Sequence, residues 1–68
     1  MMRELSEREL EVTRLVAKGY SNLEIAEQLD LVEGTVKIHV HHAMVKIGVR
    51  NRTELTLYAL GRRIKPRR

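Results

Sequence analysis

The chain has 68 residues, which is enough for one small domain but too short for a large core or a deep ligand pocket. It contains no Cys, which excludes disulfide bonds and Cys-based zinc sites, and no Phe or Trp, so its core must be aliphatic. The formal net charge of +4 is divided into an acidic half (four Lys or Arg against eight Asp or Glu in residues 1–34) and a basic half (nine against one in residues 35–68).

A basic half of this kind is typical of proteins that bind nucleic acid. On charge alone, two other interpretations stay open: a solvated basic helix, and affinity for an anionic membrane surface. The longest apolar runs are only a few residues long, so no membrane-spanning helix is predicted. Charges occur throughout the first ten residues, so no signal peptide is predicted either. We therefore expect a soluble, cytoplasmic domain.

The first helix is predicted over residues 6–18. Ser6 and Glu9 have the spacing of a capping box, in which the hydroxyl and the carboxylate each accept from a backbone N–H at the start of the helix. Gly19 follows the helical pattern, as expected for a residue that ends a helix in the left-handed conformation. Thr13 lies on the face that should be buried, and its hydroxyl is expected to donate to the carbonyl of Glu9.

The second helix is predicted over residues 21–29, again from a capping box, which Ser21 and Glu24 form. Only residues 30–32 separate it from the next helical pattern. Two short helices joined by a short turn are typical of the helix-turn-helix motif, whose second helix enters the major groove of DNA.

The third helix, residues 33–47, is amphipathic with an unusual outer face. At about 100° per residue, one face collects the apolar side chains of a core, namely Val36, Val40, Ala43, Met44 and Ile47. The opposite face has no acidic residue and consists of Gly34, Ile38, His41 and Val45, flanked by Lys37 and His42. His39 and Lys46 share the remaining edge. A small, basic and partly apolar strip suits a groove lined with phosphates, base edges and thymine methyl groups.

The fourth helix is predicted over residues 51–60, from a third capping box with Asn51 as the cap and Glu54 as its partner. A basic tail, residues 62–68, follows it. No segment alternates with a period of two over more than a few residues, so no strand is predicted. The sequence therefore predicts a single all-α domain of four helices.

All three histidines lie in the third helix, which raises the possibility of a metal site. His39 and His42 are i,i+3 neighbours, but His41 points elsewhere and no third ligand follows at a recognised spacing. The alternative is that all three are solvated surface histidines. No nucleophile, orienting residue and pocket accompany them, so we expect neither a metal, nor a cofactor, nor an enzyme.

Four motifs in order resemble one known family: LSERE, KGYSNLEIA, TVKIHV and KIGVRNRTEL. Together they resemble the LuxR/FixJ-type DNA-binding domain, the C-terminal output module of many bacterial response regulators and quorum-sensing regulators. The resemblance covers residues 4–60. It implies a four-helix bundle in which the second and third helices form the helix-turn-helix and the fourth forms a two-fold homodimer.

The resemblance also implies roles for individual residues. The positions that face DNA bases are Lys37, Ile38 and His41. The positions expected to contact the DNA backbone are Asn22, Thr35, His39, Lys46, Asn51, Arg52 and Thr53. The positions expected at the dimer interface are Leu55, Leu57, Tyr58 and Gly61, with packing inside the protomer as the alternative for the leucines.

Five positions depart from what the family usually has. Val32 stands where Ser or Thr caps the recognition helix, and Asp30 stands where the turn has Gly. Thr13 replaces Leu, Ala43 replaces Ile, and Val45 replaces a basic residue. These departures predict lower stability and weaker DNA binding, with no change of fold.

Two rival functions stay open from the sequence. The promoter-reading C-terminal domain of sigma factors shares the LSERE and EGTVK motifs, although the GVRNRTEL segment argues against it. A protein-interaction module would use the basic helix to bind an acidic partner. The expected partners are double-stranded DNA, a second copy of the chain and RNA polymerase, with no membrane and no small-molecule ligand. Neither the operator sequence nor the choice between activation and repression follows from the sequence.

Overall fold

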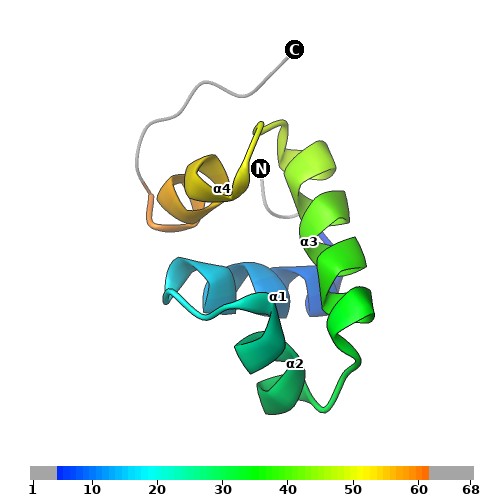
Figure 1. Ribbon diagram of the computed structural model, residues 1–68. Coiled ribbons are helices and arrows are strands. Elements are labelled where there is room, and N and C mark those ends of the chain that lie inside the picture. Colours follow the sequence, from blue (N-terminus) through cyan, green and yellow to red (C-terminus); the bar gives the residue numbers. More distant parts are fainter. Residues whose placement is uncertain (1–4, 62–68) are drawn as a thin grey trace.

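The computed structural model describes residues 5–61, which form four α-helices and no strand (Figure 1). The helices are α1 (Glu7–Ala17), α2 (Asn22–Leu29), α3 (Glu33–Ile47) and α4 (Arg52–Ala59). The all-α prediction is confirmed, and each helix end lies within one residue of its expected position. The predicted basic tail, residues 62–68, lies outside the described residues. Within the described range, no helix is long and apolar enough to cross a membrane.

Side chains cap the beginnings of three helices. Ser6 and Glu9 form the expected capping box at α1, with N–H to oxygen distances of 3.0 and 3.1 Å, and Ser21 forms the same arrangement at α2. At α4 the capping box is only half formed. The Asn51 side chain accepts from the N–H of Glu54, but the Glu54 carboxylate accepts from the N–H of Arg50 and not from that of Asn51. The third capping box is therefore corrected to a single asparagine cap.

α1 lies in the middle of the bundle, between α2 and α4, and α3 runs along one side of the molecule (Figure 1). α1 packs against α3 and α4, and α2 packs mainly against α3. The core between them is aliphatic, as expected, and consists of Val12, Val16, Ile25, Ala26, Val36, Val40, Ile47, Val49 and Leu55. The predicted core face of α3 is confirmed, because Val36, Val40, Ala43 and Ile47 are buried and Met44 packs against the same cluster.

Leu55 was expected at the dimer interface, and its position in the structure corrects that expectation. Its side chain has no exposed surface (0 %) and belongs to the hydrophobic core of its own protomer. A side chain that is completely covered within one chain has no surface left to offer a second chain. Leu55 therefore anchors α4 to the rest of the fold.

Thr13 lies in the centre of the core without a hydrogen bond. The side chain is fully buried, and its hydroxyl has no hydrogen-bond partner among the described residues. The expected bond from this hydroxyl to the carbonyl of Glu9 is therefore wrong. A buried hydroxyl without a partner destabilises the folded state, because it has lost its bonds to water and gained none in return.

Replacing Thr13 with valine is expected to raise the free energy of unfolding by about 1–2 kcal/mol, since the shape is kept and the unpaired hydroxyl is removed. Urea unfolding followed by circular dichroism measures the change. The matched control is Thr56→Val on α4, where the side chain is only partly buried and the same exchange should alter stability by less than about 0.5 kcal/mol. A Thr13→Val protein less stable than the parent would show that this hydroxyl is satisfied.

The turn between α2 and α3 depends on a residue in an uncommon conformation. Asp30 ends α2 with φ 58° and ψ 48°, and it is the one non-glycine residue of the described range with positive φ. Its N–H and that of Leu31 both donate to the carbonyl of Ala26, which closes the end of α2. Val32 then begins α3 in an extended conformation without a side-chain cap, as predicted. This turn sets the angle at which α3 leaves α2.

Candidate nucleic-acid interface

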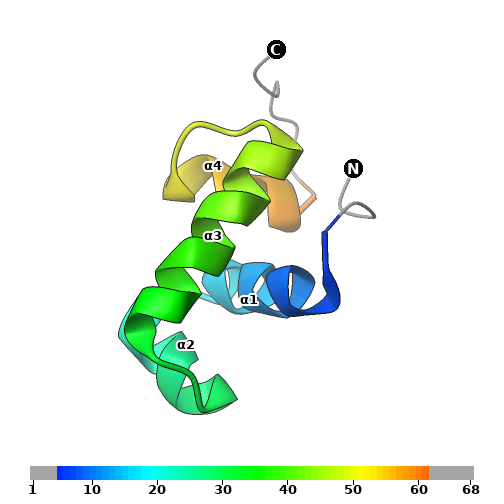
Figure 2. The ribbon, with the colours of Figure 1, turned by 90° about the vertical axis from the view of Figure 1, so that its right-hand side faces the viewer.

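The outer face of α3 is the exposed strip formed by Gly34, Lys37, Ile38, His41, His42 and Val45. Figure 2 looks onto α3 from the side away from α1, and this is the side that α1 and α2 leave uncovered. Ile38 is 55 % exposed and Val45 is 64 % exposed. Among residues 5–61, neither Lys37 nor His41 takes part in a side-chain hydrogen bond or an ion pair. The three predicted base-contacting side chains, Lys37, Ile38 and His41, thus lie together and are accessible.

Lys46 lies on the edge of α3 and is tied to α1. Its ammonium donates to Oε1 of Glu9 at 2.8 Å, while His42 Nδ1 lies 3.7 Å from the other oxygen of the same carboxylate. The Glu9 side chain is only 7 % exposed, whereas that of Lys46 is 40 % exposed. Lys46 therefore holds α3 against α1, while its side chain stays partly exposed.

The hydrogen bond from Lys46 holds the pKa of Glu9 below its ordinary value of 4.5, and the N–H of Ser6 acts in the same direction. Desolvation of the buried carboxylate opposes them. A lowered pKa in the folded state means that the ionised carboxylate stabilises the fold above about pH 4.5, and that this stabilisation is lost as pH falls through the lowered value.

Glu9→Gln is therefore expected to be less stable than the parent by about 1 kcal/mol at pH 7, because Lys46 loses its ionic acceptor. The difference between the two proteins should shrink between pH 5 and pH 3. Urea unfolding at a series of pH values measures it, with Glu11→Gln as the control for an exposed carboxylate on the same helix. A difference that stays constant over this range would mean that the charge of Glu9 does not stabilise the fold.

His39 is partly buried, on the same edge of α3 as Lys46. Its Nδ1 atom is buried and has no hydrogen-bond partner among the described residues. Only its other ring nitrogen is left for the backbone contact that the sequence predicted. No group of three or more His, Cys, Asp or Glu side chains within residues 5–61 is placed to hold a metal ion.

The beginnings of α2 and α4 meet through Arg52. Its Nη1 donates to Oδ1 of Asn22 at 2.6 Å, and its Nη2 donates to the backbone carbonyl of Tyr20 at 2.8 Å. We call these two bonds the α2–α4 bridge. Arg52 is partly buried, and this burial lowers the pKa of its guanidinium. The sequence predicted Arg52 and Asn22 as two separate contacts to the DNA backbone. In the structure their side chains are hydrogen-bonded to each other.

The other expected backbone contacts also lie at helix beginnings. Thr35 is in the first turn of α3, and Asn51 and Thr53 open α4 with exposed side chains. Figure 2 shows the starts of α2 and α4 on the same side of α3. Helix N-termini carry unpaired N–H groups and the positive end of the helix dipole, so this side of the molecule favours anions.

Exposed apolar side chains occupy the end of α4. Leu57 is 36 % exposed and Leu60 is 54 % exposed, while Tyr58 is partly buried against the core and Gly61 is exposed. Leu60 was not among the expected dimer residues. The i,i+3 spacing of Leu57 and Leu60 could have indicated that Leu60 belongs with Leu57, because residues three apart lie on one face of a helix.

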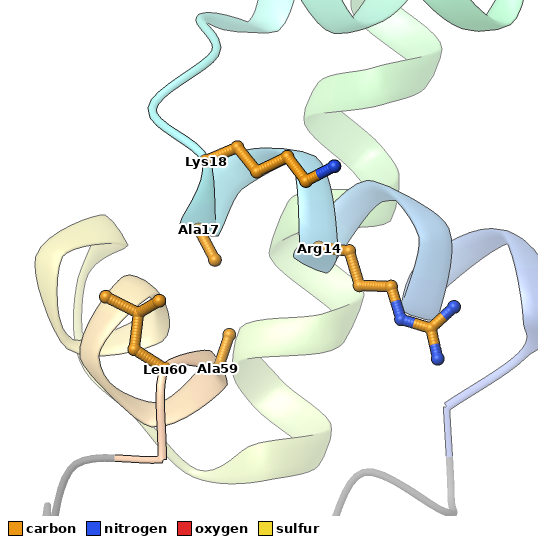
Figure 3. A pocket seen from close by; sticks show the side chains of 5 residues that line it. All are labelled: Arg14, Ala17, Lys18, Ala59 and Leu60. Carbon is orange, nitrogen blue, oxygen red and sulfur yellow. The ribbon is translucent and has the colours of Figure 1, made fainter.

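A shallow groove of about 300 Å³ separates the last turn of α1 from the end of α4. In Figure 3, Ala17 points toward Ala59 and Leu60, and the cationic side chains of Arg14 and Lys18 extend along α1. Neither cation is paired with a carboxylate of residues 5–61. This groove lies apart from α3, the basic helix that the alternative of a protein-interaction module would use.

Comparison with known proteins identifies related sequences. The family model described as bacterial regulatory proteins, luxR family, matches residues 3–59. The oxygen regulatory protein NreC of Staphylococcus aureus strains JH9 and Mu3 is 48 % identical over 60 residues in each case. The matched segment is 88 % of this chain but 28 % of the relative, so the chain spans less than a third of the length of these curated relatives.

Proposed function

Because the chain belongs to the luxR family of bacterial regulatory proteins, we propose that it reads a specific sequence of double-stranded DNA as a homodimer. The family resemblance expected from the motifs is confirmed, and the domain is of the DNA-binding, transcription-regulating type. This match favours the interpretation over the sigma-factor alternative. To this family function we add the proposal that the domain reads a particular operator and that α3 lies in the major groove.

The observation that carries the proposal is the outer face of α3. It is exposed and has no acidic side chain after Glu33, and its basic and apolar groups have the chemistry of a major groove. Lys37 donates a hydrogen bond to guanine, and Ile38 contacts a thymine methyl group. His41 contacts a purine. The family resemblance gives these three positions, and the groups that bases display in the major groove give the partner of each.

Phosphate contacts hold the domain in register on the duplex and supply most of the affinity. They come from the helix beginnings: Asn22 at α2, Thr35 at α3, and Asn51 and Thr53 at α4. His39 and the remaining N–H groups of Lys46 add contacts along the edge of α3.

The homodimer forms through the exposed apolar face of α4. Leu57 and Leu60 supply its apolar centre, with Tyr58 and Gly61 beside them. A two-fold dimer presents two copies of α3 to one side of the duplex, so the operator is an inverted repeat with half-sites about one helical turn, or roughly 10 bp, apart. RNA polymerase is the second partner that we propose.

The test is selection from a library of randomised duplexes, followed by fluorescence-anisotropy titration of the enriched sequence at two salt concentrations. We expect an inverted repeat to be enriched and its affinity to fall steeply with salt. Binding that depends on salt but enriches no sequence would contradict operator reading. Absence of DNA binding, together with binding of an acidic protein, would favour the interaction-module alternative.

A further inference from the structure

We propose that Arg52 is a positioning residue: through the α2–α4 bridge it turns the amide of Asn22 so that the NH₂ group faces a DNA phosphate. This inference rests on the proposed DNA-binding function and deepens it. It changes the expected role of Arg52, which acts on the phosphate through Asn22 and is not an independent phosphate contact.

The geometry of the bridge is specific. Two nitrogens of one guanidinium donate to two acceptors on the same short segment, the side-chain oxygen of Asn22 at 2.6 Å and the backbone carbonyl of Tyr20 at 2.8 Å. These acceptors lie 30 and 32 residues before Arg52 in the chain. The bond to Asn22 joins the first residue of α4 to the first residue of α2, and the bond to Tyr20 reaches the segment just before α2. Two directed bonds from a planar group hold the guanidinium in one orientation.

The chemistry of arginine then determines which way the Asn22 amide points. A guanidinium has only donors, so the atom of Asn22 that faces it must be the acceptor oxygen. The opposite orientation would place an NH₂ group against a cation, with both groups donating and neither accepting. The oxygen is therefore held toward Arg52, and the NH₂ group is directed away from it.

The direction of this NH₂ group matters because of where Asn22 lies. It is the first residue of α2, beside the unpaired N–H groups of a helix of eight residues. An outward NH₂ adds two donors to that helix beginning, and all of these groups bind the same kind of ligand, an anionic oxygen. The α2 beginning thereby becomes a complete phosphate site only when Arg52 is in place.

A double-mutant cycle on the selected duplex separates positioning from independent contact. The proteins are the parent, Asn22→Ala, Arg52→Ala and the double variant, each measured by anisotropy at a temperature where urea unfolding shows it to be folded. Each single change is expected to weaken DNA binding about 10-fold, as for loss of a hydrogen bond to a charged group. The double variant is also expected to lose about 10-fold, because both changes remove the same phosphate contact.

A conservative variant adds a second readout. Arg52→Lys keeps the charge but cannot make two directed bonds, so it is expected to bind DNA as weakly as Arg52→Ala. Arg50→Lys is the matched control, because Arg50 is exposed and its side chain makes no hydrogen bond or ion pair among the described residues; it should bind like the parent.

The outcomes distinguish this inference from the proposed function. A loss of about 100-fold in the double variant, or full rescue by Arg52→Lys, would mean that Arg52 contacts a phosphate by itself and would overturn the positioning role alone. Failure of the parent protein to bind any duplex would overturn both. Similar losses in the two single variants and in the double variant, without rescue by lysine, establish Arg52 as the residue that orients Asn22.

Discussion

Replacing Leu55 with alanine is expected to lower the free energy of unfolding by about 2–5 kcal/mol. The side chain is completely buried and joins α4 to the core that α1 and α3 build. Its removal leaves a cavity in a core that consists mostly of β-branched side chains, which cannot move far to fill the space. A domain of this size has a stability near the lower end of the usual range, so the variant should be largely unfolded at 37 °C.

Urea unfolding followed by circular dichroism tests this expectation, and Leu57→Ala is the matched control. It makes the same chemical change on the same helix at a side chain that is 36 % exposed, so its effect on protomer stability should be less than about 1 kcal/mol. The Leu55→Ala effect should be independent of protein concentration, because it acts within one protomer. A larger loss from Leu57→Ala than from Leu55→Ala would mean that α4 packs with its other face inward.

Lys37→Ala is expected to weaken binding to the selected operator by about 1–3 kcal/mol and to relax the preference at one base pair in each half-site. The side chain is exposed on the outer face of α3 and makes no ion pair within the described residues, so its removal leaves the fold intact. A lysine that donates to guanine carries sequence information, which a lysine bound to phosphate does not.

Repeating the selection with the variant protein separates these two roles. Lys18→Ala is the control: it removes the same charge from an exposed residue at the end of α1, away from the outer face of α3. It should lower affinity slightly and leave the base preferences unchanged. If Lys37→Ala also leaves every preference unchanged while lowering the salt dependence, then Lys37 binds a phosphate and the base assignment is wrong.

The features that could be predicted from the sequence are those encoded by neighbouring residues. Capping residues at the starts of three helices and glycines after three of the four act within four positions, and the ends of all four helices were predicted to within one residue. The two faces of α3 follow from the helical period, and the structure confirms its core face. The roles of individual outer residues toward DNA were expected from the family resemblance and stay predictions.

The features that could not be predicted join residues far apart in the chain. The bond from Lys46 to Glu9 spans 37 residues, and the bond from Arg52 to Asn22 spans 30. Each of these four side chains also has an ordinary local role, as a surface cation or a helix-start residue, so nothing in the local pattern indicates its partner. The burial of Leu55 is of the same kind, because Leu55 and Leu57 look alike until α1 is placed beside α4.

The separation of the two faces of α3 has a consequence for how such a domain diversifies. Val36, Val40 and Ala43 hold the helix in the core, while Lys37, Ile38 and His41 face outward. The side chains of these three outward residues make no hydrogen bond or ion pair with the described part of the chain. Exchanges at the outward positions leave folding almost untouched, so a duplicated copy of the gene can drift toward a new target site one residue at a time. Every intermediate on that path remains a folded protein on which selection can act.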